Sequence, residues 1–220
     1  MPEPMTAIAI PTTLASKKVV EGVLSEISDL IKKSVNLPFK AWRARYHIET
    51  LHKRVRQLRM VKTIFQIEKE IDLAKFYHPS KIEVGDKTKV VSRLSDIPSS
   101  GSVLIEGTAG QGKSIFLRYL ACIEFCISRR IPIFIELRRL REGQTLQAVV
   151  LQELSVLGFQ ASEGLFEFLA EKSKVLLLLD GFDEVKRRRE VSITLRVAIM
   201  KWGYHCLSTR KKVCNAYRLS

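Results

Sequence analysis

Hydrophobic side chains recur every three or four residues in the first third of the chain, which is the spacing of one face of an α-helix. Stripes of this kind predict three amphipathic helices, beginning near Leu14, at Phe39 and at Val61. The third stripe ends near Ala74, where polar and aromatic residues interrupt the pattern. We therefore expect a small N-terminal α-helical domain over residues 1–76.

The pattern changes after a loop rich in serine and glycine. Short apolar runs then alternate with longer amphipathic stretches, as in a sheet whose strands are joined by helices. The expected strands cover 103–105, 133–137 and 175–179, and the expected helices cover 114–129, 145–157 and 162–171. This order predicts an α/β fold, a three-layer domain with a parallel sheet over residues 97–220. Residues 77–96, with a turn signal at Gly85-Asp86, are expected to be a linker.

The excess of basic over acidic residues lies at the two ends of the chain. The formal net charge is +14; residues 1–60 carry 11 basic and 5 acidic side chains, and residues 181–220 carry 10 and 3. Such basic surfaces attract nucleic acid, acidic lipid or an acidic protein, or they are simply solvated helix faces. No apolar run reaches the roughly 18–20 residues of a membrane helix, and no basic n-region marks a signal peptide. We therefore expect a cytoplasmic protein without a membrane span.

The first candidate site is a glycine-rich segment between an expected strand and an expected helix. Its residues are Gly107, Thr108, Ala109, Gly110, Gln111, Gly112, Lys113 and Ser114, which fit G-x-x-x-x-G-K-[ST], the P-loop or Walker A pattern. Glycines let successive backbone N–H groups wrap a phosphate, and the following helix points its positive end at it. Lys113 then neutralises β- and γ-phosphate oxygens, and the Ser114 hydroxyl ligates Mg²⁺. We predict binding of ATP or ADP with Mg²⁺.

The second candidate site follows the all-apolar run at 175–179, which is typical of a strand covered on both faces. Asp180 comes directly after this run, where the strand end would fix a Walker B carboxylate that holds Mg²⁺. Gly181 leaves room beside the metal, and Asp183 or Glu184 can orient and deprotonate the attacking water. The alternative interpretation is a buried strand followed by an ordinary acidic turn.

Together, GTAGQGKS and LLLLDGFDEV resemble the NACHT branch of the STAND NTPases. Gly181 and Asp183 match the family's small residue after the metal-binding aspartate and its further acidic residue. IPIFIELRRL between the two motifs resembles the second strand of bacterial members, and the whole match covers residues 97–185. The resemblance implies a nucleotide-controlled switch in which ADP holds a closed monomer and ATP permits self-oligomerisation. Bacterial members act in antiphage defence or regulation.

Beyond residue 185 the resemblance weakens. The family's next strand ends in an arginine that senses the γ-phosphate, and Arg210 in Ser208-Thr209-Arg210 is the candidate, although the order of residues is altered. The alternative is that Arg210 is a plain surface charge. The lid, winged helix and sensor repeats of the family do not follow, so we expect a truncated or frame-shifted product, or an excerpt.

Two functions from different classes fit these observations. The first is a STAND-type signalling module that binds ATP or ADP and hydrolyses ATP slowly with Mg²⁺. Its expected catalytic residues are Lys113, Asp183, Glu184 and Arg210, and its expected metal ligands are Ser114 and Asp180. The alternative is a basic helical adaptor for nucleic acid or protein, with the P-loop as a structural nucleotide site. A steep dependence of binding on salt would indicate the nucleic-acid version of the adaptor.

Overall fold

The computed structural model describes residues 17–33, 48–63, 66–84, 86–97, 102–108, 110–141, 143–157, 159, 162–181, 197–200 and 215–219.

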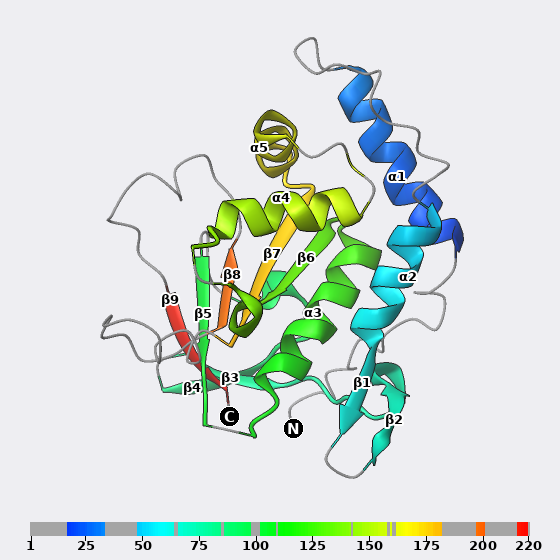
Figure 1. The fold of residues 1–220 in the computed structure, drawn as a ribbon. Coiled ribbons are helices and arrows are strands. Elements are labelled where there is room, and N and C mark those ends of the chain that lie inside the picture. The colour runs from blue at the N-terminus through cyan, green and yellow to red at the C-terminus, as the bar shows by residue number, and fades with distance from the viewer. Residues whose placement is uncertain are drawn as a thin grey trace.

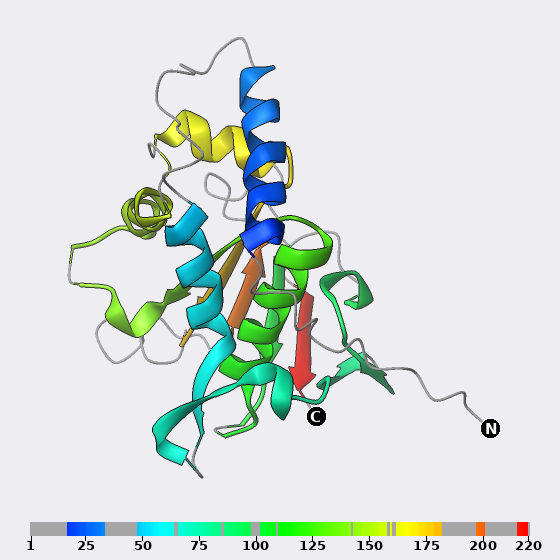
Figure 2. The ribbon, with the colours of Figure 1, turned by 90° about the vertical axis from the view of Figure 1, so that its right-hand side faces the viewer.

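Two helices form the N-terminal part, as the first two hydrophobic stripes predict. Helix α1 covers Lys17–Lys32, and α2 covers Ile48–Arg59. Helix α2 packs against α1 on one side and against α3 (Lys113–Ile127) on the other (Figures 1 and 2). The contact buries the apolar stripe of α1, formed by Val20, Val23, Leu24, Ile27 and Ile31. Glu26 of α1 also pairs with Lys174 and, at 3.5 Å, with Arg129, so α1 is joined to the rest of the protein both through α2 and directly.

The third predicted helix is wrong. Residues 61–74 lie in an antiparallel hairpin, β1 (Met60–Thr63) and β2 (Gln66–Asp72), followed by the short 3-10 helix η4 (Leu73–Lys75). Ile67 and Ile71 suggested a helix because residues four apart share a helix face, but they also share one face of a strand. Both isoleucines are β-branched, and β-branched residues are enriched in strands.

The main sheet has seven strands in the order β4-β3-β9-β5-β8-β7-β6. Their bounds are Lys81–Val84 for β3, Lys87–Val90 for β4, Ser102–Glu106 for β5, Ile131–Glu136 for β6, Val175–Asp180 for β7, Val197–Met200 for β8 and Asn215–Leu219 for β9. Strand β5 is parallel to β9, and β6 is parallel to β7. Strand β8 is antiparallel to both β5 and β7, and β3 is antiparallel to β9 and β4. The sheet is therefore mixed, which corrects the prediction of a parallel one.

Residues 77–96, expected to be a linker, contribute structure to this sheet. Strands β3 and β4 form a hairpin at one sheet edge, and Asp86 lies in the turn between them, as the turn signal predicts. The short 3-10 helix η5 (Leu94–Asp96) follows, and the Leu94 amide donates to Glu124 of α3 at 3.0 Å. The segment is thus tied to the helix that begins the nucleotide-binding motif.

Strand β7 lies between β8 and β6, and the five apolar residues at 175–179 are all buried, as the sequence predicts for a strand covered on both faces. Helices α3 and α4 (Leu146–Val156) pack against β6, and α5 (Glu163–Glu171) packs against β7. The Thr145 and Ser162 hydroxyls accept from backbone amides at the starts of α4 and α5. These contacts hold the carboxyl ends of β6 and β7 in fixed positions.

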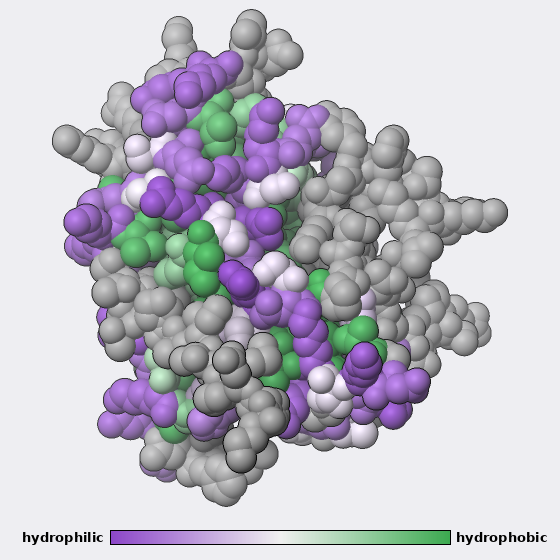
Figure 3. All heavy atoms as spheres, turned by 180° about the vertical axis from the view of Figure 1, so that it is seen from behind, coloured by the Kyte–Doolittle hydropathy of each residue, from purple (hydrophilic) through white to green (hydrophobic). Residues whose placement is uncertain are grey.

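The outer surface mixes hydrophilic and apolar residues. On the face turned away from the view of Figure 1, hydrophilic residues are interspersed with smaller apolar patches (Figure 3). Within the described ranges, the helices are all too short or too polar to cross a lipid bilayer.

Candidate functional site

The glycine-rich loop lies between β5 and α3, as the sequence predicts. Gly110 and Gly112 have φ angles of 84° and 79°, in the left-handed region that residues with a side chain rarely adopt. Gly112 is also the residue that precedes the first turn of α3. These two glycines therefore let the chain turn sharply into the helix, so that the helix N-terminus faces the loop.

Gly107 lies close to the side chain of Gln111. A Cβ atom at this position would lie 2.4 Å from Oε1 of Gln111. That oxygen accepts a hydrogen bond from the Thr108 amide at 2.5 Å. The loop is therefore closed by its own glutamine side chain, whose flexible end would have to shift if residue 107 carried a side chain.

Lys113 lies over the loop and not in solvent. Its Nζ donates to the carbonyl oxygens of Gly107 and Thr108, each at 2.7 Å. Both acceptors are neutral carbonyl groups. Phosphate oxygens attract the ammonium group more strongly than these carbonyl oxygens do, because they carry negative charge.

Ser114 and Asp180 meet although they are 66 residues apart in the chain. The Ser114 hydroxyl donates to Oδ1 of Asp180 at 2.9 Å, and Asp180 is the last residue of β7. A hydroxyl and a carboxylate are hard oxygen ligands, and Mg²⁺ is commonly held by one or two such groups together with phosphate oxygens and water. The pair therefore fits a magnesium ion that is shared with a bound nucleotide.

The structure brings together only part of the predicted site. Gly181 follows Asp180 with a φ of 75°, so a left-handed turn begins directly after β7. Ala109, Asp183, Glu184 and Arg210 lie outside the described residues. Their roles therefore stay predictions from the sequence.

Glu136 is a residue of this region that the sequence analysis missed. It ends β6 as Asp180 ends β7, and the two are register partners in the parallel pair. Its carboxylate accepts from Arg118 at 3.3 Å, from Arg138 at 3.0 Å and from Arg139 at 2.8 Å. The signal in the sequence was an acidic residue directly after an apolar strand, which is the same signal that identified Asp180.

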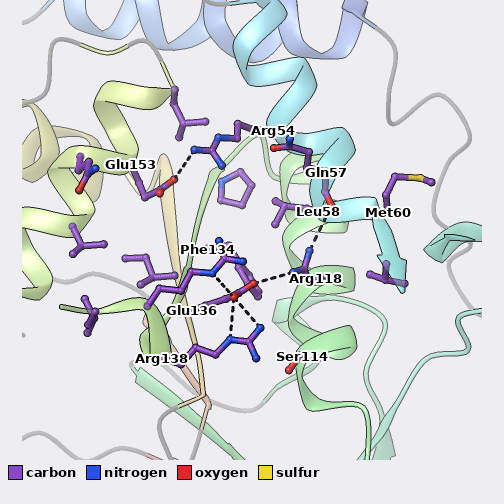
Figure 4. Close-up of a pocket in the computed structure, with 18 of the residues that line it drawn as sticks. Arg54, Gln57, Leu58, Met60, Ser114, Arg118, Phe134, Glu136, Arg138 and Glu153 are labelled. Atoms are coloured by element: carbon purple, nitrogen blue, oxygen red, sulfur yellow. Dashed lines mark hydrogen bonds and ion pairs between the residues drawn. The ribbon is translucent and has the colours of Figure 1, made fainter. Parts of the chain in front are cut away.

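A cavity of about 910 Å³ opens beside Glu136. It lies between α2 and the β1–β2 hairpin on one side and β6, α4 and the start of α3 on the other. In Figure 4, Glu136 lies near its centre, and Arg118 and Arg138 point toward this carboxylate. Ser114 lies at its border, so the cavity adjoins the Ser114–Asp180 pair.

Two cysteine thiols lie on α3. Both are free; Cys122 is buried and Cys126 is partly buried. Burial raises the pKa of the Cys122 thiol to about 12 and that of Cys126 to about 11, since a thiolate is poorly solvated there. At neutral pH these side chains are protonated and pack as small hydrophobic groups.

Comparison with known proteins gives one match. The family model described as NACHT domain matches residues 102–211, which is half of the 220-residue chain and contains the phosphate loop and Asp180. No curated protein and no solved structure matches.

Proposed function

Because the chain belongs to the NACHT family of P-loop NTPases, we propose that it is a signalling switch controlled by ATP and ADP. The family binds nucleotide, generally with Mg²⁺. In this proposal the chain binds ATP or ADP at residues 107–114 and hydrolyses ATP slowly. Hydrolysis would convert an ATP state that supports self-association into a closed ADP state.

The observation that carries the proposal is the contact between Ser114 and Asp180. Two motifs that are far apart in the sequence contribute oxygen ligands to one point at the N-terminus of α3. A P-loop without such a carboxylate would bind phosphate but would lack a fixed ligand for the metal. The 2.9 Å contact therefore supports nucleotide binding with Mg²⁺ over binding of a simple anion.

Each residue of the motif has one role in this proposal. Lys113 would move from the loop carbonyls to the β- and γ-phosphate oxygens, and the loop amides would surround the β-phosphate. Ser114 and Asp180 would hold Mg²⁺. Asp183 and Glu184 would orient and deprotonate the attacking water, and Arg210 would contact the γ-phosphate. The magnesium ion would neutralise charge that develops on the phosphate oxygens.

The test is nucleotide binding by Lys113→Ala, measured by isothermal titration calorimetry with ADP and Mg²⁺. The substitution removes two charge-assisted hydrogen bonds of about 1.5–3 kcal/mol each, so we expect affinity to fall by about a hundredfold or more. The matched control is Lys172→Ala directly after α5, which removes the same charge near the amino end of β7, opposite the end that carries Asp180. Wild-type affinity in Lys113→Ala would refute nucleotide binding at this loop.

The signalling role, in bacterial defence or regulation, is a further part of the proposal. It is supported by the family, whose members often oligomerise. Size-exclusion chromatography of the protein with ATP and with ADP would test it, because a nucleotide switch of this kind predicts different oligomeric states. Identical elution with both nucleotides would contradict the switch without affecting nucleotide binding.

A further inference from the structure

Helix α3 carries two side chains, one helical turn apart, that reach the ends of neighbouring strands. The Ser114 hydroxyl donates to Asp180 at the end of β7. Arg118 donates at 3.3 Å to Glu136 at the end of β6. Glu136 and Asp180 are register partners, and neighbouring strands lie only about 4.8 Å apart. The arginine contact therefore lies beside the pair of residues that we propose to hold Mg²⁺.

Three groups fix the guanidinium of Arg118. Besides its contact with Glu136, its Cζ lies 4.9 Å from the centre of the Phe134 ring. Its NH1 also makes a long hydrogen bond, of 3.5 Å, to the carbonyl oxygen of Gln57. Figure 4 shows this side chain between Gln57 and Glu136, with one dashed contact to each. The planar guanidinium can bind two acceptors at once because its N–H donors point in fixed, different directions.

The contact with Gln57 is made at the end of a helix. Gln57 lies in the last turn of α2, which ends at Arg59. The last four carbonyl groups of a helix have no partner inside it, and a cation there interacts favourably with the negative end of the helix dipole. Arg118 supplies both a donor and a positive charge to this helix end. It therefore links α2 directly to the residue that lies next to Asp180 in the sheet.

Helix α2 has other attachments, which do not lead to the Ser114–Asp180 pair. Arg54 pairs with Glu153 of α4 at 3.6 Å, and Arg59 pairs with Asp72 at the end of β2. These contacts, together with the packing of α2 on α1 and α3, would remain in a protein without the Arg118 side chain. Such a protein would lose the connection between α2 and the end of β6.

We propose that Arg118 is a positioning residue that couples binding of nucleotide with Mg²⁺ to the last turn of α2. The coupling rests on the proposed binding of ATP or ADP with Mg²⁺ at residues 107–114. Ser114 and Asp180 are held together when nucleotide and metal are bound, which restricts the first turn of α3 and the neighbouring strand ends. Arg118, one turn further along α3, transfers this restriction to α2. A ligand stabilises the arrangement of the elements to which it binds, so the end of α2 opens less often in the bound protein.

Hydrogen–deuterium exchange of the full chain, measured by mass spectrometry with and without ADP and Mg²⁺, tests the coupling. The peptide with residues 107–114 reports nucleotide binding itself, and the peptide with residues 56–59 reports the last turn of α2. In the wild type we expect ADP with Mg²⁺ to slow exchange in both peptides. The slowing in α2 should be about fivefold or more, which is the lower end of usual couplings between two sites. In Arg118→Ala at saturating ADP, we expect slowing in the loop and none in α2.

The matched control is Arg54→Ala, which also removes an arginine contact of α2. Arg54 pairs with α4 and not with a residue beside Asp180. We therefore expect ADP with Mg²⁺ to slow exchange at the end of α2 in this variant as much as in the wild type, whatever its basal rate.

Thermal unfolding of each variant checks that it is folded. If Arg118→Ala does not fold, Arg118→Lys gives the same test, because lysine keeps the positive charge beside Glu136 but lacks the forked guanidinium that reaches both acceptors. We expect this variant to lose the response of α2 as well.

Equal slowing of α2 exchange in Arg118→Ala and in the wild type would overturn the proposal, because Arg118 would then only stabilise the fold. Slowing confined to the loop in the wild type would also overturn it. Loss of the α2 response in Arg54→Ala would do the same, since the response would then depend on any attachment of α2. If the wild-type loop itself shows no slowing, the proposed nucleotide binding fails and the coupling fails with it, and the loop peptide thus distinguishes the two failures.

Discussion

Replacing Asp72 by alanine would remove the carboxylate that holds the end of α2 against the end of β2. Nε of Arg59 donates to Oδ1 of Asp72 at 2.7 Å, and NH2 of Arg59 donates to Oδ2. Oδ1 also accepts from the Ala74 amide at 3.0 Å, which caps η4. The Arg59 side chain is only 9% exposed, so the substitution leaves a buried positive charge without its partner.

The expected loss of stability follows from these contacts. Removing one partner of a buried ion pair costs about 3–5 kcal/mol, and we take the lower end because the Asp72 side chain is 21% exposed. Loss of the cap adds about 1 kcal/mol, which gives a total of about 4 kcal/mol for Asp72→Ala. Asp72→Asn keeps an oxygen for Ala74 and for one Arg59 donor, so we expect about 2 kcal/mol.

The same pair predicts a dependence on pH. Burial raises the pKa of Asp72, but the hydrogen bonds from Arg59 and from the Ala74 amide lower it by more than burial raises it. The net result is a pKa below the ordinary value. The ionised pair therefore stabilises the fold above the unfolded-state pKa of about 4. This contribution is lost as the pH falls through the lower pKa of the folded state. The difference in stability between wild type and Asp72→Asn should shrink in that acidic range.

Urea unfolding followed by circular dichroism measures the free energies of unfolding. The control is Glu49→Ala, which breaks an ion pair of α2 with Lys17 whose side chains are 70% and 59% exposed, and we expect no measurable change from it. If Asp72→Ala destabilises the protein no more than Glu49→Ala does, the assignment of a structural role to the Arg59–Asp72 pair is wrong.

Two further predictions concern the site and the helix behind it. Asp183→Ala should slow steady-state ATP hydrolysis by about a hundredfold or more if this carboxylate acts on the attacking water. If the wild type turns over ATP no faster than Asp183→Ala does, the chain binds ATP without hydrolysing it. Cys122, with a pKa of about 12 in the folded protein, should resist iodoacetamide at pH 8 and react once urea unfolds the chain. Peptide mass spectrometry distinguishes the two states, and rapid labelling of folded Cys122 would contradict its burial.

The parts of the site that depend on neighbouring residues could be predicted from the sequence. The glycines and Lys113 lie next to one another in the chain, and their pattern specifies backbone angles and a helix start that the structure contains. Asp180 was found because five apolar residues precede it in the sequence. In the structure these residues form the buried strand β7. The contact between Asp180 and Ser114 follows from where β7 ends and α3 begins.

Other features required the folded chain. Ile67 and Ile71 are four residues apart, a spacing that fits a helix face and a strand face alike, so the hairpin was missed. The arginines of the cavity lie at positions from 54 to 141 and meet only after α2, α3 and η6 (Leu137–Arg139) have packed. Likewise, β8 is antiparallel to both β5 and β7, a pairing that no local pattern specifies.

The position of β9 has a consequence for the synthesis of the protein. Strands β3 and β5 are close in the sequence, yet β9 lies between them, and its residues at 215–219 are made more than a hundred residues after β5. At about 5–20 residues per second, the ribosome needs roughly 5–20 s for this interval. During that time the β3 and β5 edges that β9 later covers carry unpaired backbone groups, which can pair with other chains. A nascent chain of this protein is therefore prone to aggregation at these two edges until β9 has emerged.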